Sequence, residues 1–128
     1  MGEHRESLDK LTEAIIGAAI EVHRELGAGL LESVYEECLS KELEIAGLHF
    51  LRQPVLPVHY KGTTIEGAFR MDLLVDNAVV VEVKSVEKLL PIHEAQLLTY
   101  LRLSKKRIGL LLNFNVKLMK NGIRRIVL

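Results

Sequence analysis

Tryptophan is absent from this 128-residue sequence, cysteine occurs once, and no hydrophobic run is long enough to cross a membrane. The single cysteine, Cys38, cannot form an internal disulfide, so we expect a buried thiol in a reducing compartment. The first residues are polar and charged and do not resemble a secretion signal. These absences predict a cytoplasmic protein with no membrane partner.

Common catalytic motifs are missing as well. Cysteine and histidine do not cluster at the spacing of zinc sites, and neither the GxxxxGK[ST] phosphate loop nor the GxSxG nucleophile elbow occurs. Gly27 and Gly29 precede a predicted helix, but no strand leads into them. A dinucleotide-binding fingerprint is therefore not indicated.

Acidic residues are absent from Ala95 onward, although the formal net charge of the whole chain is zero. Residues 1–50 contain 4 Lys+Arg and 11 Asp+Glu, whereas residues 51–128 contain 13 and 6. A basic surface suits a phosphate-containing partner, but lysines also protect exposed strand edges, and both explanations stay open. The basic residues that we single out as nucleic-acid contacts are Lys105, Lys106, Arg107, Lys117, Lys120, Arg124 and Arg125.

The length and the 48% hydrophobic content predict one domain, residues 1–128, with a core of its own. Apolar residues at helical spacing predict three helices. The first follows an N-cap at Ser7 and ends at Gly27, the second runs from about Leu30 to Gly47, and the third runs from Pro91 to Ser104.

Alternating and continuous apolar runs predict the strands between these helices. We expect an edge strand at residues 53–60, a strand from residue 63 that Gly67 bulges, a hairpin at 69–84, an internal strand at 108–114, and strands at 116–119 and 123–128 around a tight Asn121-Gly122 turn. The third helix, between two strands, permits a parallel crossover. The order predicts an α/β fold in which helices flank a mixed β-sheet.

The hairpin at residues 69–84 organises the rest of the chain. Asp76 and Asn77 form turns readily and lie between two β-rich runs. Because strand side chains alternate, Glu82 and Lys84 share one face of the second run. A carboxylate and an amine on a strand apolar enough to be central are hard to explain by solubility.

Asp72, in the first run, lies at about the same height as this pair. A three-residue loop would place Asp72 opposite Glu82, whereas a two-residue turn would place it opposite Val81 and direct it away. If the two acids cooperate, the sequence predicts an odd loop or a bulge here. Two acids and Lys84 at the end of a buried hairpin then predict a divalent-metal site with a charged helper.

Other polar residues could join such a site. Gln96 and Tyr100 are four apart on the third helix and share a face, where they could orient a water or a phosphate oxygen. Glu32 falls in the first turn of the second helix, where a carboxylate also suits the helix dipole. His23, alone on the first helix, is either a hydrogen-bonded structural residue or a metal ligand.

The residues resemble a known family. Asp72 followed by Glu82-Val83-Lys84 resembles the D…ExK core of the PD-(D/E)XK nuclease superfamily. Gln96 and Tyr100 resemble the QxxxY motif of its RecB-like and lambda-exonuclease-like branch, and the segment from Gly29 to Tyr35 matches the signature of the small GxxExxY proteins. The resemblance runs from about residue 11 to the C-terminus.

The resemblance implies a restriction-endonuclease-like fold and a metal-dependent deoxyribonuclease. Asp72, Glu82 and the carbonyl of Val83 would ligate Mg²⁺ or Mn²⁺, and Met71 stands where the superfamily has proline. The catalytic residues would be Asp72 and Glu82 themselves, Lys84 at the attacking water and phosphate, Glu32 near the metal through water, and Gln96 and Tyr100, which would hold substrate or order Lys84.

The implied partner is DNA, with RNA left open. A domain this small has little surface for selecting a substrate, so a homodimer or a protein partner would also fit. The alternative is a non-catalytic nucleic-acid-binding or protein-partner module that keeps the nuclease fold, and hydrolysis of another phosphodiester, such as a nucleotide messenger, is a third reading. His23 stays outside the implied metal set.

Overall fold

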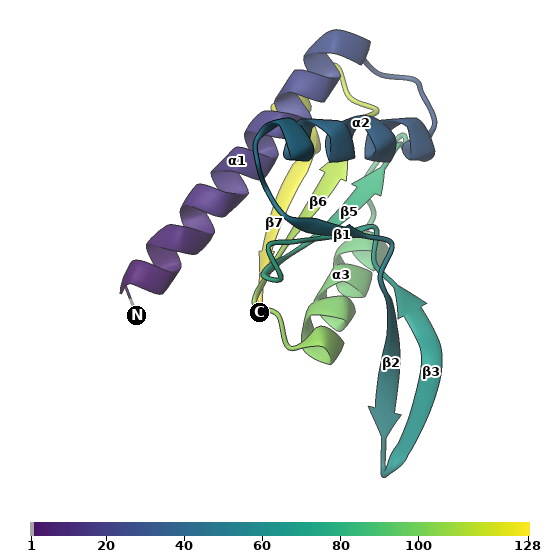
Figure 1. Ribbon diagram of the computed structural model, residues 1–128. Coiled ribbons are helices and arrows are strands. Elements are labelled where there is room, and N and C mark those ends of the chain that lie inside the picture. The colour runs from purple at the N-terminus through teal and green to yellow at the C-terminus, as the bar shows by residue number, and fades with distance from the viewer. Residues whose placement is uncertain (1) are drawn as a thin grey trace.

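The computed structural model describes the backbone of residues 2–128 and the side chains of residues 5–128. A five-stranded mixed sheet, with strand order β1-β4-β5-β6-β7, forms its centre, and β2 and β3 form a separate two-stranded sheet (Figure 1). The elements are α1 (Gly2–Leu26), α2 (Glu32–Ile45), β1 (Phe50–Arg52), β2 (Val55–Tyr60), β3 (Thr63–Arg70), β4 (Leu73–Val75), β5 (Val79–Lys84), α3 (Pro91–Ser104), β6 (Ile108–Asn113), the 3₁₀ helix η1 (Met119–Gly122) and β7 (Ile123–Val127).

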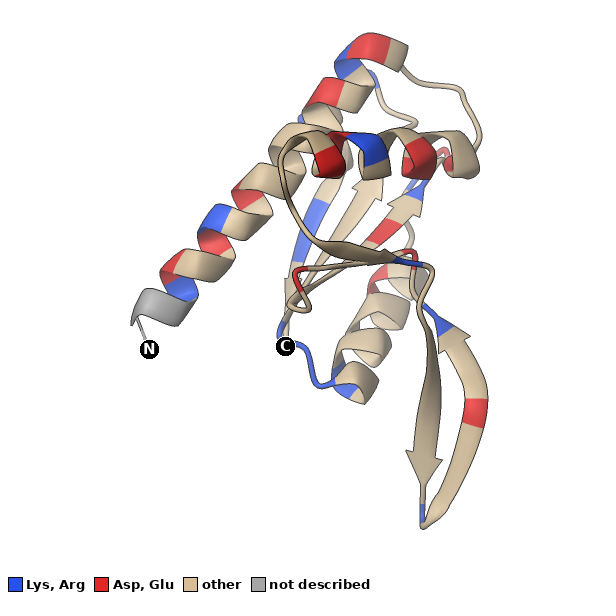
Figure 2. Ribbon diagram, viewed as in Figure 1, with Lys and Arg blue, Asp and Glu red and all other residues tan. Residues whose placement is uncertain are grey.

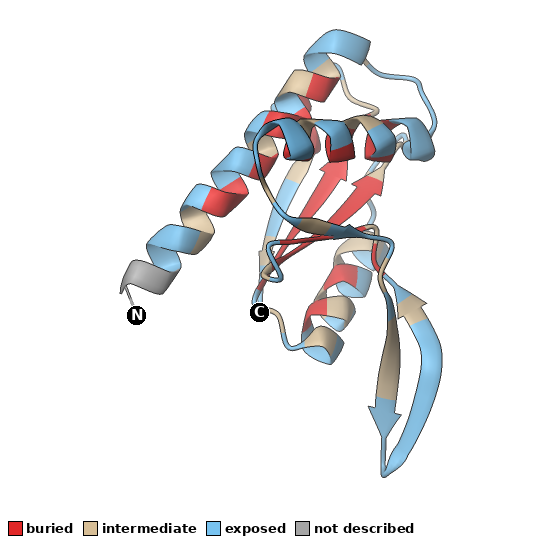
Figure 3. Ribbon diagram, in the orientation of Figure 1, coloured by how far each residue is buried: buried red, intermediate tan, exposed pale blue. Residues whose placement is uncertain are grey.

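Helices cover both faces of the main sheet. α1 and α2 pack on one face, over Val79, Val81 and Val83 of β5, and α3 packs on the other, over Val80. β5 and β6 pair in parallel, and all six residues of β6 are buried, which confirms the predicted internal strand and the predicted crossover (Figure 3). Apolar side chains on both faces of β6 require cover on both sides.

The predicted odd loop is confirmed. β4 and β5 pair antiparallel with Leu73 opposite Val81 and Val75 opposite Val79, so residues 76–78 form a three-residue loop. Asp76 and Asn77 both adopt positive φ, at 51° and 52°, which asparagine and aspartate tolerate better than most residues. Continued by one residue, this register sets Asp72 opposite Glu82.

The first run of the predicted hairpin is not one strand. β3 ends at Arg70, and the chain leaves the two-stranded sheet there before it enters the main sheet at Leu73. β2 and β3 form a hairpin arm that extends beside α3 in Figure 1. The register of the arm shifts where Gly67 has a φ of 61°, which confirms the bulge expected at this glycine. An alternating pattern does not indicate which sheet a strand joins, so the sequence predicts a single sheet where the structure has two.

Four further expectations were wrong. Ser7 is no N-cap, because α1 begins at Gly2. No strand forms at residues 116–119, and β7 pairs directly with β6. Gly122 ends η1 where an added Cβ would lie 2.0 Å from the carbonyl oxygen of Asn113, so this glycine allows a close approach rather than a hairpin turn. Cys38 is free but half-buried rather than buried.

No helix in the described part of the chain is both long enough and apolar enough to span a bilayer.

Candidate active site

The Asp72 and Glu82 carboxylates lie close together, just beyond the last paired residues of β4 and β5. The backbone N–H of Asp72 donates to Glu82 Oε2 at 2.8 Å, and the backbone N–H of Val83 donates to Asp72 Oδ2 at 2.7 Å. Each carboxylate therefore satisfies a backbone donor near the other acid, at a point where ladder pairing has ended. The two acids converge, as the three-residue loop predicts.

The two carboxylates are electrostatically unfavourable as they stand. Burial, with the nearby charge of Asp72, raises the pKa of Glu82 from 4.5 to about 8, although the Asp72 N–H acts in the opposite direction. Burial also raises the pKa of Asp72. Two like charges in a poorly solvated site favour either protonation or a bound cation.

Lys84 lies on the same strand two residues beyond Glu82, and strand alternation places both side chains on one face. Its ammonium lowers the pKa of both Asp72 and Glu82, so it is close enough to act on each. Among the side chains of residues 5–128, the Lys84 Nζ makes no ion pair or hydrogen bond. The amine is therefore not sequestered by a structural partner.

The loop before α2 brings Glu32 to the end of β5. Gly29 adopts a φ of 99°, and the backbone N–H of Ser85 donates to Glu32 Oε2 at 3.3 Å. The Ser85 hydroxyl donates to the Leu30 carbonyl at 2.6 Å. The charge of Glu32 contributes to the raised pKa of Asp72, which places this carboxylate within electrostatic range of the pair.

Tyr35 has a structural role in the segment from Gly29 to Tyr35. Its hydroxyl donates to the Gly27 carbonyl at 2.6 Å and accepts from the Leu30 N–H at 3.1 Å. Its ring stacks on Phe114 with centroids 4.6 Å apart. Tyr35 thus fastens the loop that presents Glu32.

Replacing Tyr35 with phenylalanine should lower the free energy of unfolding by about 1–3 kcal/mol, because Gly27 and Leu30 would each lose a partner. Urea unfolding measures this loss. Tyr60→Phe is the matched control, since that residue is 58% exposed, and we expect a change within about 0.5 kcal/mol. Equal effects from the two variants would show that the Tyr35 hydroxyl does not hold the loop.

The two α3 residues differ in how closely they approach the acids. Tyr100 is half-buried against Phe69, with ring centroids 5.0 Å apart, and the charges of Glu82 and Asp72 add to burial in raising its pKa. Gln96 is exposed one turn earlier and has no hydrogen-bond partner among the described residues. Tyr100 therefore borders the site, and Gln96 lies on the open surface.

The basic residues singled out above lie at both ends of β6 and along β7, and Figure 2 shows Lys and Arg at several separate places on the ribbon. Lys105, Lys106 and Arg107 precede β6, whose first residue pairs with Val79, while Lys84 pairs with Asn113 at the other end. Five residues of strand separate these ends by roughly 17 Å. Arg125 is paired with Asp9 at 2.5 Å, and Arg124 Nη1 donates to backbone carbonyls, whereas Lys117 and Lys120 follow β6 at the Lys84 end.

His23 has a structural partner. Its Nε2 lies 2.7 Å from the Val116 carbonyl oxygen, so Nε2 carries the proton and donates. This contact joins α1 to the segment after β6 and favours the structural reading of His23.

Sequence reasoning missed two buried polar residues beside the site. Glu36, 5% exposed on α2, accepts from Arg52 Nε at 2.8 Å and from Gln53 Nε2 at 3.0 Å. Asn113 is also buried, and its amide bonds both backbone groups of Val86, which fixes the connector after Lys84. The available signal was a polar residue in an otherwise apolar segment, at the end of β6 for Asn113 and one turn beyond Glu32 for Glu36.

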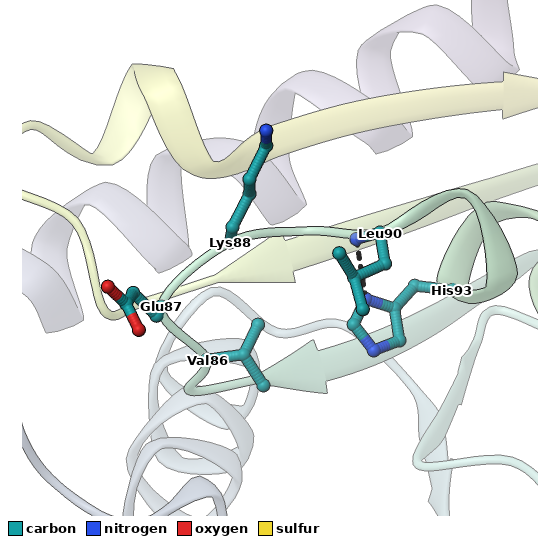
Figure 4. Close-up of a pocket in the computed structure, with 5 residues that line it drawn as sticks. All are labelled: Val86, Glu87, Lys88, Leu90 and His93. Atoms are coloured by element: carbon teal, nitrogen blue, oxygen red, sulfur yellow. Dashed lines mark hydrogen bonds between the residues drawn. The ribbon is translucent and has the colours of Figure 1, made fainter.

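A cavity of about 650 Å³ opens over the connector between β5 and α3. Its lining residues are Val86, Glu87, Lys88, Leu90 and His93, and Figure 4 shows the Leu90 N–H donating to His93 Nδ1 at 2.9 Å. Neither acid of the Asp72–Glu82 pair contributes to this lining. The cavity adjoins the chain segment after Lys84 but does not enclose the carboxylates.

The donor set fits a hard divalent cation. The second oxygen of each of the two carboxylates has no hydrogen-bond partner within the described residues. The Val83 carbonyl points to the same strand edge as its N–H, toward Asp72. Among the described residues, no group of three or more His, Cys, Asp or Glu side chains is arranged to hold a metal ion. Mg²⁺ commonly binds through one or two carboxylates and keeps water or phosphate ligands, so a smaller set suffices.

Comparison with known proteins agrees with this geometry. A family model described as the PD-(D/E)XK nuclease superfamily matches residues 9–126. No curated protein and no solved structure matches significantly. The five-stranded mixed sheet with helices on both faces is consistent with the restriction-endonuclease-like fold. The chain belongs to the PD-(D/E)XK nuclease superfamily.

Proposed function

We propose that the protein is a divalent-metal-dependent nuclease that hydrolyses DNA phosphodiester bonds at Asp72, Glu82 and Lys84. Membership of the superfamily suggests a nuclease-type function and a nucleic-acid substrate. The observation that carries the proposal is the convergence of the buried Glu82 and the half-buried Asp72, joined through backbone N–H groups, beside a lysine that has no ion pair among the described side chains.

Each residue has a role that its position supports. Asp72, Glu82 and the Val83 carbonyl would hold Mg²⁺ or Mn²⁺. A bound ion of this kind supplies a Lewis acid for the phosphate and a more acidic water. Lys84 places a compact positive charge beside the scissile phosphate and orients the attacking water. Water adds to phosphorus as the bond to the leaving oxygen breaks, and the proton released from the water passes to solvent or to a neighbouring base.

The remaining residues would bind the substrate or order the groups around the metal. Glu32, held by the Ser85 N–H, is placed to contact metal-bound water. Tyr100 borders the acids and would hold substrate or order Lys84, and Gln96 would meet the substrate at the open surface. We further propose that the chain belongs to the GxxExxY proteins, in the RecB-like and lambda-exonuclease-like branch; the segment from Gly29 to Tyr35 and the Gln96–Tyr100 spacing support this placement.

A manganese titration tests the metal site directly. We expect calorimetry to show one bound Mn²⁺. Asp72→Asn should raise the Mn²⁺ dissociation constant by at least about tenfold, because one ligand charge is lost. Asparagine can still accept from Val83, which limits the disturbance. Glu87→Gln, an exposed acid of the same chain, is the control and should bind as the wild type does. Binding that is indifferent to Asp72 would contradict the proposed ligand.

We propose that residues 1–128 form one domain and that this domain acts on DNA. RNA as the substrate, a homodimer and a protein partner are further possibilities to test. All seven singled-out basic residues stay candidates: Lys105, Lys106 and Arg107 at one end of β6, Lys117 and Lys120 at the other, and Arg124 and Arg125 between them on β7. Replacing Lys117 and Lys120 with alanine should reduce the slope of log affinity against log salt by up to about 1.8, since each phosphate contact contributes about 0.9. Fluorescence anisotropy over a salt series measures the slope, and an unchanged slope would exclude these two lysines.

A further inference from the structure

Gln53 has a backbone conformation that few side-chain-bearing residues adopt. It follows the last residue of β1, at the point where the chain leaves the main sheet for the arm, and its φ is 56°. Its backbone N–H donates to the Asp72 carbonyl at 2.7 Å, and the Met71 N–H donates to the Pro54 carbonyl at 3.2 Å. Both contacts fall at the base of the arm, where the chain passes Asp72. A left-handed residue other than glycine persists only where surrounding contacts hold it.

Glu36 supplies the contact that holds Gln53. This side chain is 7% exposed, and its Oε2 accepts from both Gln53 Nε2 at 3.0 Å and Arg52 Nε at 2.8 Å. A buried carboxylate without partners would be costly, so these hydrogen bonds fix Glu36 and its donors relative to one another. Because Glu36 belongs to α2, the helix that begins with Glu32, the contact ties α2 to the base of the arm.

Arg52, the last residue of β1, precedes Gln53 in the chain. It pairs with Leu73 in the ladder between β1 and β4, and its Nη1 also donates to Glu37 Oε2 at 2.6 Å. Glu37 is 71% exposed, unlike Glu36. The same arginine therefore contacts one buried acid and one exposed acid, and only the buried acid also contacts Gln53.

We propose that Glu36 and Gln53 are positioning residues for the carboxylate pair. Glu36 holds the Gln53 side chain, Gln53 holds the main chain at Asp72, and the Asp72 carboxylate thereby stays in place to accept from the Val83 N–H. The role of Glu36 and Gln53 in metal binding rests on the proposed function, but the hydrogen-bonded connection from Glu36 through Gln53 to Asp72 does not. Neither residue needs to touch substrate.

Amide hydrogen exchange in the metal-free protein tests the link. Gln53→Ala should make the Val83 amide exchange at least about tenfold faster, because the Asp72 carboxylate that accepts its proton is released. Leu111, at the centre of the sheet, should exchange at its wild-type rate. Gln53→Gly removes the same amide without requiring alanine to adopt a positive φ, so a change shared by both variants follows from the lost contact. Glu37→Gln is the matched control and should leave Val83 unchanged.

Calorimetry with Mn²⁺ provides a second readout. Gln53→Ala should raise the Mn²⁺ dissociation constant by about 10–100-fold, which is the range typical of changes at residues that orient metal ligands. Glu36→Gln should cause a smaller loss, because its amide oxygen can still accept from Gln53.

The possible outcomes separate the two proposals. An unchanged Val83 exchange rate in both Gln53 variants overturns the positioning role, and so does faster exchange that includes Leu111, which would indicate general destabilisation. If the wild type binds no Mn²⁺, the proposed function fails, while the exchange rates still decide whether Glu36 and Gln53 hold Asp72.

Discussion

Replacing Lys84 with alanine should reduce DNA cleavage by about 10²–10⁴-fold while the protein stays folded. Lys84 is the one cation that acts on both acids and, within the described side chains, has no ion-pair partner of its own. Its removal therefore takes positive charge from the scissile phosphate without breaking a structural contact. Single-turnover cleavage of labelled DNA with Mg²⁺ measures the rate, and thermal unfolding checks the fold.

Lys41→Ala is the control for Lys84→Ala. Lys41 is an exposed lysine on α2 with only a 4.0 Å contact to Glu44, so cleavage should continue at the wild-type rate. Cleavage that persists in both Lys84→Ala and Asp72→Asn would point to a contaminating nuclease. A wild-type protein that binds Mn²⁺ and DNA yet never cleaves would favour the non-catalytic module.

Replacing Glu82 with glutamine should stabilise the metal-free protein at alkaline pH. The folded-state pKa of Glu82 is about 8, above its ordinary value of 4.5, so the folded state binds this proton more tightly than the unfolded state does. The stability from this proton is complete below pH 4.5 and is lost as the pH rises through about 8. Glutamine keeps an acceptor for the Asp72 N–H and does not ionise.

At about 1.4 kcal/mol per pKa unit, the advantage of Glu82→Gln above pH 8 should be on the order of a few kcal/mol, and it should shrink toward pH 5. Urea unfolding at pH 5, 7 and 9 in the presence of a chelator measures it. Adding Mg²⁺ at pH 9 should stabilise the wild type more than the variant, because the ion binds only the folded site. Parallel curves for wild type and variant would contradict the raised pKa.

The central hairpin could be predicted because its signals are local. Asp76 and Asn77 mark the loop, and the requirement that Asp72 meet Glu82 selects three residues over two. The internal strand β6 and the helix starting at Pro91 likewise follow from continuous apolar residues and from a proline at a first turn. Apolar pattern and turn chemistry act over a few residues, so a sequence displays them directly.

What could not be predicted depends on partners distant in the chain. β1 has only three residues and exists because it pairs with β4, more than twenty positions later. The bond between Glu36 and Gln53 spans 17 positions, and neither residue shows a pattern that would connect them. The separation of Lys105 from Lys117 follows from the direction of β6, which composition does not encode.

The two apolar cores take their residues from β5 in alternation, and neither core includes Asp72 or Glu82. The chemistry and the packing are therefore encoded by different positions of the same strand. A descendant that lost Glu82 would keep the two apolar cores and would lose a buried charge, and one that lost Asp72 would lose a half-buried charge. Pseudoenzymes should arise easily from this architecture, and under the proposed function selection for cleavage, rather than for folding, would keep the acids in place.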